Sequence, residues 1–334
     1  MENTENVYRG DIDSAGAVRR GLLIVNLGSP SSPQPAQVRE FLREFLRDPR
    51  VVDFPRPLWL PILHGIVLRT RPRKSSKLYQ SIWNAAGSPL VIFTKSQRDH
   101  LAAELPHYSV KYAMTYTQPR ISQVLSEFAA EGITDLTVVS LYPQSAPSST
   151  GAITDQVFSH YAGALHTPNL RIISQYPVQP DYISWYVEAV SKHLAQHNFD
   201  LVVFSFHGVP ARDSHRPQGY RAECNATAAE IMAGVREQGH DVASLVTFQS
   251  KFGPGKWLTP ATIDTMRQLP AQGIKSVLVA TPGFISDCLE TIDEIGVLNR
   301  DEFLAAGGEH FSRVLPPNDD PIVTQIIKNM LPEN

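Results

Sequence analysis

Short apolar runs rich in β-branched residues alternate with helix-length amphipathic segments along most of this 334-residue chain. A run with no polar face is typical of a strand buried on both sides, and the segment that follows is long enough to begin a parallel neighbour. The alternation therefore predicts an α/β protein whose parallel sheets are covered by helices on both faces. The expected strands are 22–27, 110–116, 136–142, 170–176, 201–207, 244–250 and 276–282, and the expected helices are 34–46, 119–131, 151–164, 180–197, 219–237 and 260–272.

The length of the chain is enough for about two domains. We predict two Rossmann-like, doubly wound halves with an active-site cleft between them. The first half is expected at 19–166, after a flexible tail at 1–18, and it includes an apolar and basic segment at 55–74. The second half is expected at 167–318, and a helix within 319–334 is expected to return to the first half.

Composition excludes several classes of protein. With 42% hydrophobic and 19% charged residues and a net charge of −3, the chain is typical of a globular protein that does not bind nucleic acid. Cys224 and Cys288 are the only cysteines, too few for a disulfide scaffold and typical of a reducing compartment. The polar opening lacks the apolar core of a signal peptide, and no run is long enough to span a membrane. We expect a cytoplasmic protein.

His207 ends the expected strand 201–207, and Gly208 and Pro210 then turn the chain. In open α/β sheets ligands bind at the carboxyl ends of the strands, which makes His207 a candidate catalytic residue. A turn histidine bonded to a backbone carbonyl explains the same pattern equally well.

Three carboxylates follow the last expected strand. Asp287, Glu290 and Glu294 have the spacing of one helical face, on a helix expected to begin near Ser286. Such a row suits a path for a divalent cation or for protons. Helix capping and a solvated helix face are the alternative explanation.

Two further stretches each have two interpretations. Trp257, in the loop 250–260, either anchors that loop on the core or forms a wall for a flat ligand. The segment 55–74 is either a core helix with a basic end or an exposed apolar lip for a membrane surface or an amphipathic anionic ligand. Its basic residues are Arg56, Arg69, Arg71, Arg73 and Lys74.

Five stretches, in their order along the chain, resemble those of ferrochelatases: LIVNLGSP, LYPQSAPSSTGA, SFHGVPAR, TFQSKFGPGKWLTP and PGFISDCLETIDEI. The resemblance runs from about residue 20 to the C-terminus and is closest to the proteobacterial branch. It implies insertion of Fe²⁺ into protoporphyrin IX with release of two protons, the last step of haem biosynthesis.

The resemblance also implies roles for individual residues. The family's active-site histidine and glutamate fall on His207 and Glu290, which would abstract protons or ligate iron. The family's aspartate falls on Asp287, and Asp287 and Glu294 would carry protons outward or the metal inward. Its porphyrin-contacting aromatic residues fall on Tyr116, Trp257 and Phe284. The segment 57–74 corresponds to a lip that closes over the porphyrin and contacts membrane through 57–68, so peripheral contact with the inner membrane face is implied.

The chain departs from the family pattern at two points. Many members hold an iron–sulfur cluster on additional cysteines, so Cys224 and Cys288 alone predict that no cluster is bound. Thr115 stands where some relatives have an arginine before the active-site tyrosine, which leaves Arg69 and Arg71 as candidates for binding the porphyrin propionates. Two other functions stay open: a different tetrapyrrole chelatase, inserting iron into coproporphyrin or inserting cobalt, and a porphyrin- or metal-binding protein without turnover.

Overall fold

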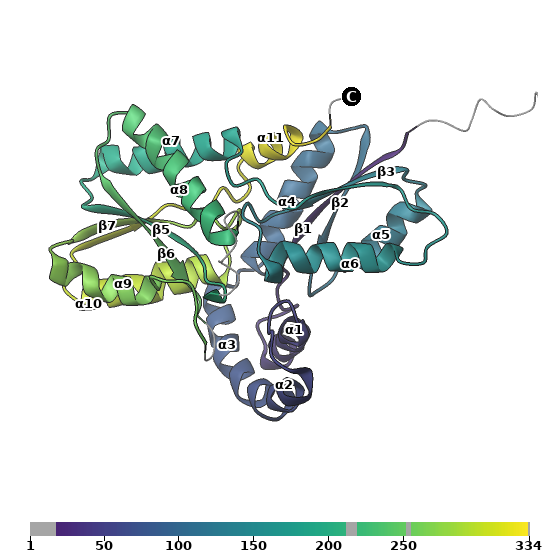
Figure 1. Ribbon diagram of the computed structural model, residues 1–334, viewed down its shortest axis with the longest axis horizontal. Coiled ribbons are helices and arrows are strands. Elements are labelled where there is room, and N and C mark those ends of the chain that lie inside the picture. Colours follow the sequence, from purple (N-terminus) through teal and green to yellow (C-terminus); the bar gives the residue numbers. More distant parts are fainter. Residues whose placement is uncertain (1–17, 212–218, 252–254, 333–334) are drawn as a thin grey trace, which may run out of the picture.

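The computed structural model describes residues 18–211, 219–251 and 255–332, so the expected tail at 1–18 lies outside it except for Val18. Within these residues two four-stranded parallel sheets form two lobes side by side (Figure 1). This arrangement confirms the predicted fold class. The first sheet has the order β2-β1-β3-β4, with β1 Arg20–Asn26, β2 Tyr108–Met114, β3 Asp135–Ser140 and β4 Asn169–Ile173. The second has the order β6-β5-β7-β8, with β5 Leu201–His207, β6 Ala243–Gln249, β7 Ser276–Ala280 and β8 His310–Arg313.

The two sheets share one topology. In each, the first strand lies inside the sheet, the second pairs on one side of it, and the third and fourth continue on the other side. The second strand is therefore added on one side of the first strand, and the third strand on the other side. Where the strand order reverses in this way, a ligand site forms at the carboxyl ends of the strands.

The strand pairing corrects the expected boundary between the halves at 166/167. β4 pairs with β3 in parallel, with Val138 opposite Ile172, so it belongs to the first sheet. The first half therefore extends at least to Ile173. The edge strand β8 was not expected, because its four residues are all half-buried and show no apolar run.

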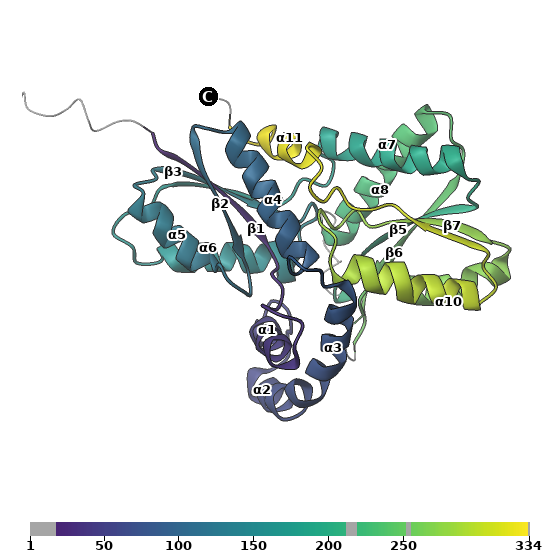
Figure 2. The same cartoon turned by 180° about the vertical axis from the view of Figure 1, so that it is seen from behind.

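Helices cover both faces of each sheet (Figures 1 and 2). Along β1, Leu22 and Ile24 belong to one core cluster, whereas Leu23 and Val25 belong to another, as alternation along a strand requires. The cluster with Leu22 continues into the second half through Phe204 of β5, so the two lobes share a core. The helices are α4 Pro89–Glu104, α5 Ile121–Ala130, α6 Ala152–Tyr161, α7 Pro180–Gln196, α8 Tyr220–Glu237, α9 Thr262–Gln268, α10 Arg300–Ala305 and α11 Ile322–Lys328.

The C-terminal helix α11 packs against α4 of the first half and α7 of the second (Figure 2). Lys328 Nζ lies 2.6 Å from Glu104 Oε2 on α4, which ties the end of the chain to the first half.

A group of helices projects away from both lobes in Figure 1. It consists of α1 Pro35–Arg47, α2 Arg56–Ile62, the π-helical turn η1 Leu63–Val67 and α3 Leu68–Ile82. Trp59 is buried, and its Nε1 donates to the carbonyl of Leu46 at 2.8 Å, whereas Leu58 and Ile66 are 58% and 61% exposed. One side of the segment thus packs into a hydrophobic core, and the other side is an exposed apolar surface. None of the helices in the described residues is long and apolar enough to span a bilayer.

Candidate active site at the strand ends

His207 is the last residue of β5 and is half-buried. Its Nδ1 lies 2.8 Å from the carbonyl oxygen of Gly208. A carbonyl can only accept, so Nδ1 carries the proton and the lone pair of the neutral ring is on Nε2. The backbone contact expected of a turn histidine therefore also leaves a basic nitrogen for chemistry. Residue 208 must be glycine, since a Cβ there would lie 2.6 Å from the carbonyl oxygen of Gln249.

The acidic helix begins later than predicted and has a different pitch. Residues Glu290–Asn299 form a π-helix, η5, and Asp287 precedes it instead of lying in its first turn. The prediction that Asp287, Glu290 and Glu294 share one helical face is therefore wrong. The cause is tertiary: Ser286 accepts a hydrogen bond from Gln97 Nε2 of α4 at 3.0 Å, so it does not cap a helix.

Asp287 is buried and fully engaged within the second half. Its Oδ1 lies 2.6 Å from Arg313 Nη1 of β8 and accepts from Thr291 Oγ1 at 2.6 Å. Asn318 donates to its other oxygen at 3.2 Å. These contacts hold the segment before η5 against β8.

Glu294 is held by the end of β6. Ser250 N donates to Oε1 at 2.7 Å, Ser250 Oγ donates to Oε2, and Gln249 Nε2 lies 3.4 Å from Oε2. Burial raises the pKa of Glu294 and the Glu290 carboxylate adds to this, whereas the Ser250 donors and His207 act in the opposite direction. Ser250 adopts a φ of 64°, which is uncommon for a residue other than glycine and is typical of functional sites.

Glu290 lies where the two halves meet. Burial raises the pKa values of Tyr79, on α3, and Tyr142, after β3, and the nearby Glu290 carboxylate contributes to both shifts. Burial likewise raises the pKa of the Cys288 thiol, with Glu290 adding to the shift. A half-buried carboxylate of the second half therefore lies near two phenols of the first.

Trp257 and Phe284 flank these strand ends. Residues 256–258 run antiparallel to 209–211, with Leu258 N donating to the carbonyl of Val209 at 3.0 Å, and this places Trp257 beside Gly208. Trp257 is half-buried, so it anchors its loop and still presents part of its ring. Phe284, also half-buried, lies in the turn after β7, where its N–H donates to the carbonyl of Thr281.

Tyr116 is placed differently from the other aromatic candidates. It is 4% exposed, packs edge-on against Phe45 at 5.2 Å, and its hydroxyl donates to Asp48 Oδ2 at 2.9 Å. Burial raises its pKa far above the usual range, and the Asp48 carboxylate adds to the shift. Thr115, before it, donates to the carbonyl of Asn26 at 3.1 Å.

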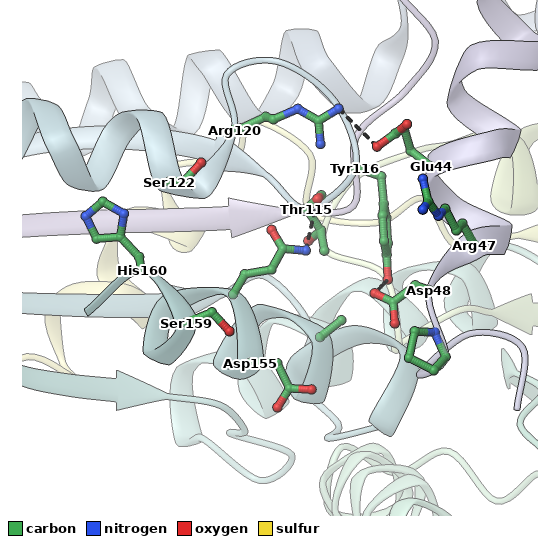
Figure 3. Close-up of a pocket in the computed structure, with 13 residues that line it drawn as sticks. Glu44, Arg47, Asp48, Thr115, Tyr116, Arg120, Ser122, Asp155, Ser159 and His160 are labelled. Atoms are coloured by element: carbon green, nitrogen blue, oxygen red, sulfur yellow. Dashed lines mark hydrogen bonds and ion pairs between the residues drawn. The ribbon is translucent and has the colours of Figure 1, made fainter. Parts of the chain in front are cut away.

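A pocket of about 560 Å³ lies beside Tyr116 (Figure 3). All of its lining residues belong to the first half, and of the predicted site residues only Tyr116 is among them. Its charges are largely matched within the protein: Arg120 pairs with Glu44 at 3.2 Å, and Arg50 with Asp155 at 2.7 Å. The pocket is thus separate from His207, Glu290 and Glu294, which belong to the second half.

The two candidate arginines of α3 differ in environment. Arg69 is exposed, whereas Arg71 is half-buried, and burial lowers its pKa while Tyr79 nearby opposes the shift. Tyr79 is also influenced by the Glu290 carboxylate, so Arg71 and Glu290 have this tyrosine as a common neighbour. Across the described residues, no three His, Cys, Asp or Glu side chains gather closely enough to hold a metal ion.

Four residues of this site were not singled out from the sequence: Gln249, Ser250, Tyr79 and Tyr142. The first two end the expected strand 244–250 as polar residues after an apolar run, the same pattern that drew attention to His207. Tyr142 likewise ends the expected strand 136–142, whereas Tyr79 carries no such pattern. Both lie near Glu290 only because the two halves pack together.

Comparison with known proteins defines the class first. The solved structure of CbiX, the terminal enzyme for biosynthesis of siroheme in denitrifying bacteria, superposes with a TM-score of 0.50 at 13% identity, covering 94% of this chain and 100% of CbiX. At that identity the likeness concerns the fold, and the chain has the two-lobed α/β fold of the chelatases.

The family follows from sequence. The ferrochelatase family model matches residues 19–334, and the chain belongs to the ferrochelatase family. The ferrochelatase of Pectobacterium atrosepticum is 41% identical over 312 residues, which cover 93% of this chain and 97% of the relative. That of Methylococcus capsulatus is 42% identical over 316 residues, covering 94% and 96%. The predicted family and the predicted enzyme class, a metal chelatase, are confirmed.

Proposed function

We propose that this chain inserts Fe²⁺ into protoporphyrin IX to form protohaem with release of two protons, the last step of haem biosynthesis. The observation that carries the proposal is that His207, whose free lone pair is on Nε2, lies near the half-buried Glu294 of helix η5, in a chain of the ferrochelatase family. Metallation requires that two pyrrole protons leave and that hydrated iron loses its waters. Both needs are met by a basic nitrogen next to carboxylates in a partly dry site.

His207 is the proposed proton acceptor. Its Nε2 carries the lone pair that would accept the proton, and the carbonyl of Gly208 holds the ring in one tautomer. Ligation of iron by the same nitrogen is the rival role, with Glu290 as the second ligand, since iron in transit can complete its coordination with water and pyrrole nitrogens.

The protons leave along η5. Glu294, whose pKa is raised by burial, holds a proton closer to neutral pH than an exposed glutamate does, and Glu290 lies nearby. Asp287 is already engaged by Arg313 Nη1 at 2.6 Å, by Thr291 and by Asn318. We therefore assign Asp287 to holding the start of η5 and the proton path to Glu290 and Glu294.

The aromatic and basic residues bind the macrocycle. Trp257 and Phe284 would supply flat apolar surfaces at the strand ends, and Arg71 is the proposed partner of a propionate. Binding energy from these contacts can bend the ring and expose its nitrogen lone pairs. Tyr116 acts through packing against Phe45, because its ring is buried.

The test is an anaerobic assay with protein, Fe²⁺ and protoporphyrin IX that follows loss of porphyrin fluorescence. His207→Ala and Glu290→Ala should each lower kcat by at least about 100-fold while the protein still binds porphyrin. His193→Ala is the matched control, because His193 Nδ1 also lies 2.8 Å from a backbone carbonyl, that of Ala189 in α7. Its kcat should stay within about twofold of wild type.

Other outcomes would select the alternatives. Turnover of coproporphyrin or Co²⁺ in place of protoporphyrin and Fe²⁺ would keep the chelatase class and replace the substrate. Tight porphyrin binding without metallation would identify a binding protein.

We further propose peripheral contact with the inner membrane face through 57–68, where Leu58, Ile62 and Ile66 are exposed beside basic residues.

We also propose that no iron–sulfur cluster is bound, since the only two cysteines are buried at separate places, Cys224 on α8 and Cys288 before η5. Acid-labile sulfide in the purified protein would contradict this.

A further inference from the structure

Gln249 links β5, the strand that ends at His207, to η5, the helix that carries Glu290 and Glu294. It is the last residue of β6, lies opposite His207 in the parallel register, and is 3% exposed. Gly208 N donates to its carbonyl at 2.7 Å. The backbone of Gln249 is therefore fixed to the residue that follows His207.

The side chain of Gln249 uses both ends of its amide. Its Oε1 accepts from Ser205 Oγ of β5 at 2.8 Å. Its Nε2 donates to the carbonyl of Glu290 at 2.9 Å and lies 3.4 Å from Glu294 Oε2. Because the oxygen end is held by β5, the nitrogen end faces η5.

A buried hydroxyl chain supports this orientation. Ser205 Oγ lies 2.8 Å from Thr262 Oγ1, which donates to Thr247 Oγ1 at 2.9 Å. All three hydroxyl residues are fully buried. Buried polar groups of this kind are retained when every member has a partner, and the network then specifies one geometry.

We propose that Gln249 is a positioning residue that sets the separation of His207 from Glu290 and Glu294. This inference rests on the proposed roles of those three residues. An amide fits because it presents an acceptor to β5 and a donor to η5, whereas a carboxylate would place an oxygen against the Glu290 carbonyl and the Glu294 carboxylate.

The test compares Gln249→Met, which keeps the length of the side chain without its hydrogen bonds, with Gln249→Glu, which reverses the donor. Both should lower kcat by about tenfold or more, with porphyrin affinity within about threefold of wild type, because the reacting groups and not the ring contacts move. Gln249→Glu should also shift the acid limb of the pH–kcat profile to higher pH, since a second carboxylate disfavours ionisation of Glu294.

Gln144→Met is the matched control. Gln144 is as buried as Gln249, and its Nε2 donates to Thr227 Oγ1 at 2.9 Å, away from His207 and η5. This variant should lose stability without the change in pH profile. Ser205→Ala is the milder second variant: it removes the partner of Oε1 and should lower kcat in the same direction by less.

Hydrogen exchange of the free protein supplies a readout that needs no turnover. Amides of residues 290–295 should exchange faster in Gln249→Met than in wild type or Gln144→Met. Unchanged exchange in η5, or an unchanged kcat and pH profile, would overturn the proposal. A wild-type protein that fails to metallate porphyrin would refute the proposed function instead, and the exchange result would still show whether Gln249 holds η5 against β5.

Discussion

Asp287, before η5, and Glu294, on η5, are two carboxylates that differ in their partners and therefore in what they can do. Asp287 has a guanidinium, that of Arg313, 2.6 Å from its oxygen. Glu294 accepts hydrogen bonds from the neutral N–H and hydroxyl of Ser250 and lies 3.4 Å from Gln249 Nε2. A compensated charge stabilises local structure, whereas an uncompensated one has its pKa raised and can exchange protons. Residue type alone does not distinguish the two.

Glu294→Gln should change the pH dependence of stability. The raised pKa means that folded Glu294 keeps its proton at a pH where the unfolded chain, with a pKa near 4.5, has lost it. Stability therefore falls as pH rises from the unfolded pKa through the raised one. The variant lacks this loss, so its free energy of unfolding relative to wild type should become more favourable as pH rises above the unfolded pKa, while kcat falls about tenfold.

Urea denaturation of both proteins at a series of pH values measures this difference. A constant difference across the range would show that Glu294 ionises normally in the folded protein.

At the scale of elements, the lip formed by α2, η1 and α3 divides its apolar residues between two sides. Trp59, Leu63 and Leu68 pack with α1 in one core cluster. Leu58, Ile62 and Ile66 face away from that cluster and are exposed. The burial of one side makes the helices stable, and the exposed side is then available for another surface.

Leu58→Ser combined with Ile66→Ser should weaken binding to vesicles of mixed zwitterionic and anionic lipids by about tenfold or more, because two apolar side chains no longer enter the interface. The melting temperature should change by less than about 2 °C, since both side chains are exposed. Co-sedimentation with vesicles measures the affinity. Phe158→Ser with Leu165→Ser is the control, an exposed apolar pair on the first lobe. An equal loss of binding in the control would argue against a specific lip contact.

At the scale of the whole molecule, the two halves are joined by polar contacts as well as by a shared core. Ser145, in the loop after β3, donates to the Glu223 carboxylate of α8 from its N–H at 2.6 Å and from its hydroxyl at 2.9 Å. Gln97 of α4 donates to Ser286 and to the carbonyl of Asn318 in the second half. Such contacts fix the position of one sheet's strand ends relative to the other.

Glu223→Ala should lower the free energy of unfolding by about 2 kcal/mol, because the two Ser145 donors lose their acceptor at a buried position. Glu223→Gln keeps an acceptor for one of them and should cost less than about 1 kcal/mol. Glu188→Ala, at an exposed position of α7, should stay within about 0.5 kcal/mol of wild type. Urea denaturation measures all three, and equal losses for Ala and Gln at 223 would contradict this account.

Much of the fold follows from the sequence because its cause is local. Fully apolar strands and amphipathic helices follow directly from residue periodicity, so seven of the strands and the α/β class could be predicted. The place of His207 at a strand end followed in the same way, from an apolar run that stops at a Gly-Pro turn. β8 escaped prediction because its four half-buried residues have no pattern of their own.

The partners of each side chain could not be predicted, because they depend on segments far apart in the chain. Ser286 and Asp287 look like a helix start, yet Gln97 and Arg313 bind them, and the helix begins at Glu290. Burial of Tyr116 behind Phe45, and of Glu290 among Tyr79 and Tyr142, likewise needs both halves in place. Local periodicity thus decided which elements form and where His207 stands. Long-range packing alone decided which carboxylates are neutralised by a cation and which are left free to exchange protons, because a pKa depends on neighbours in space.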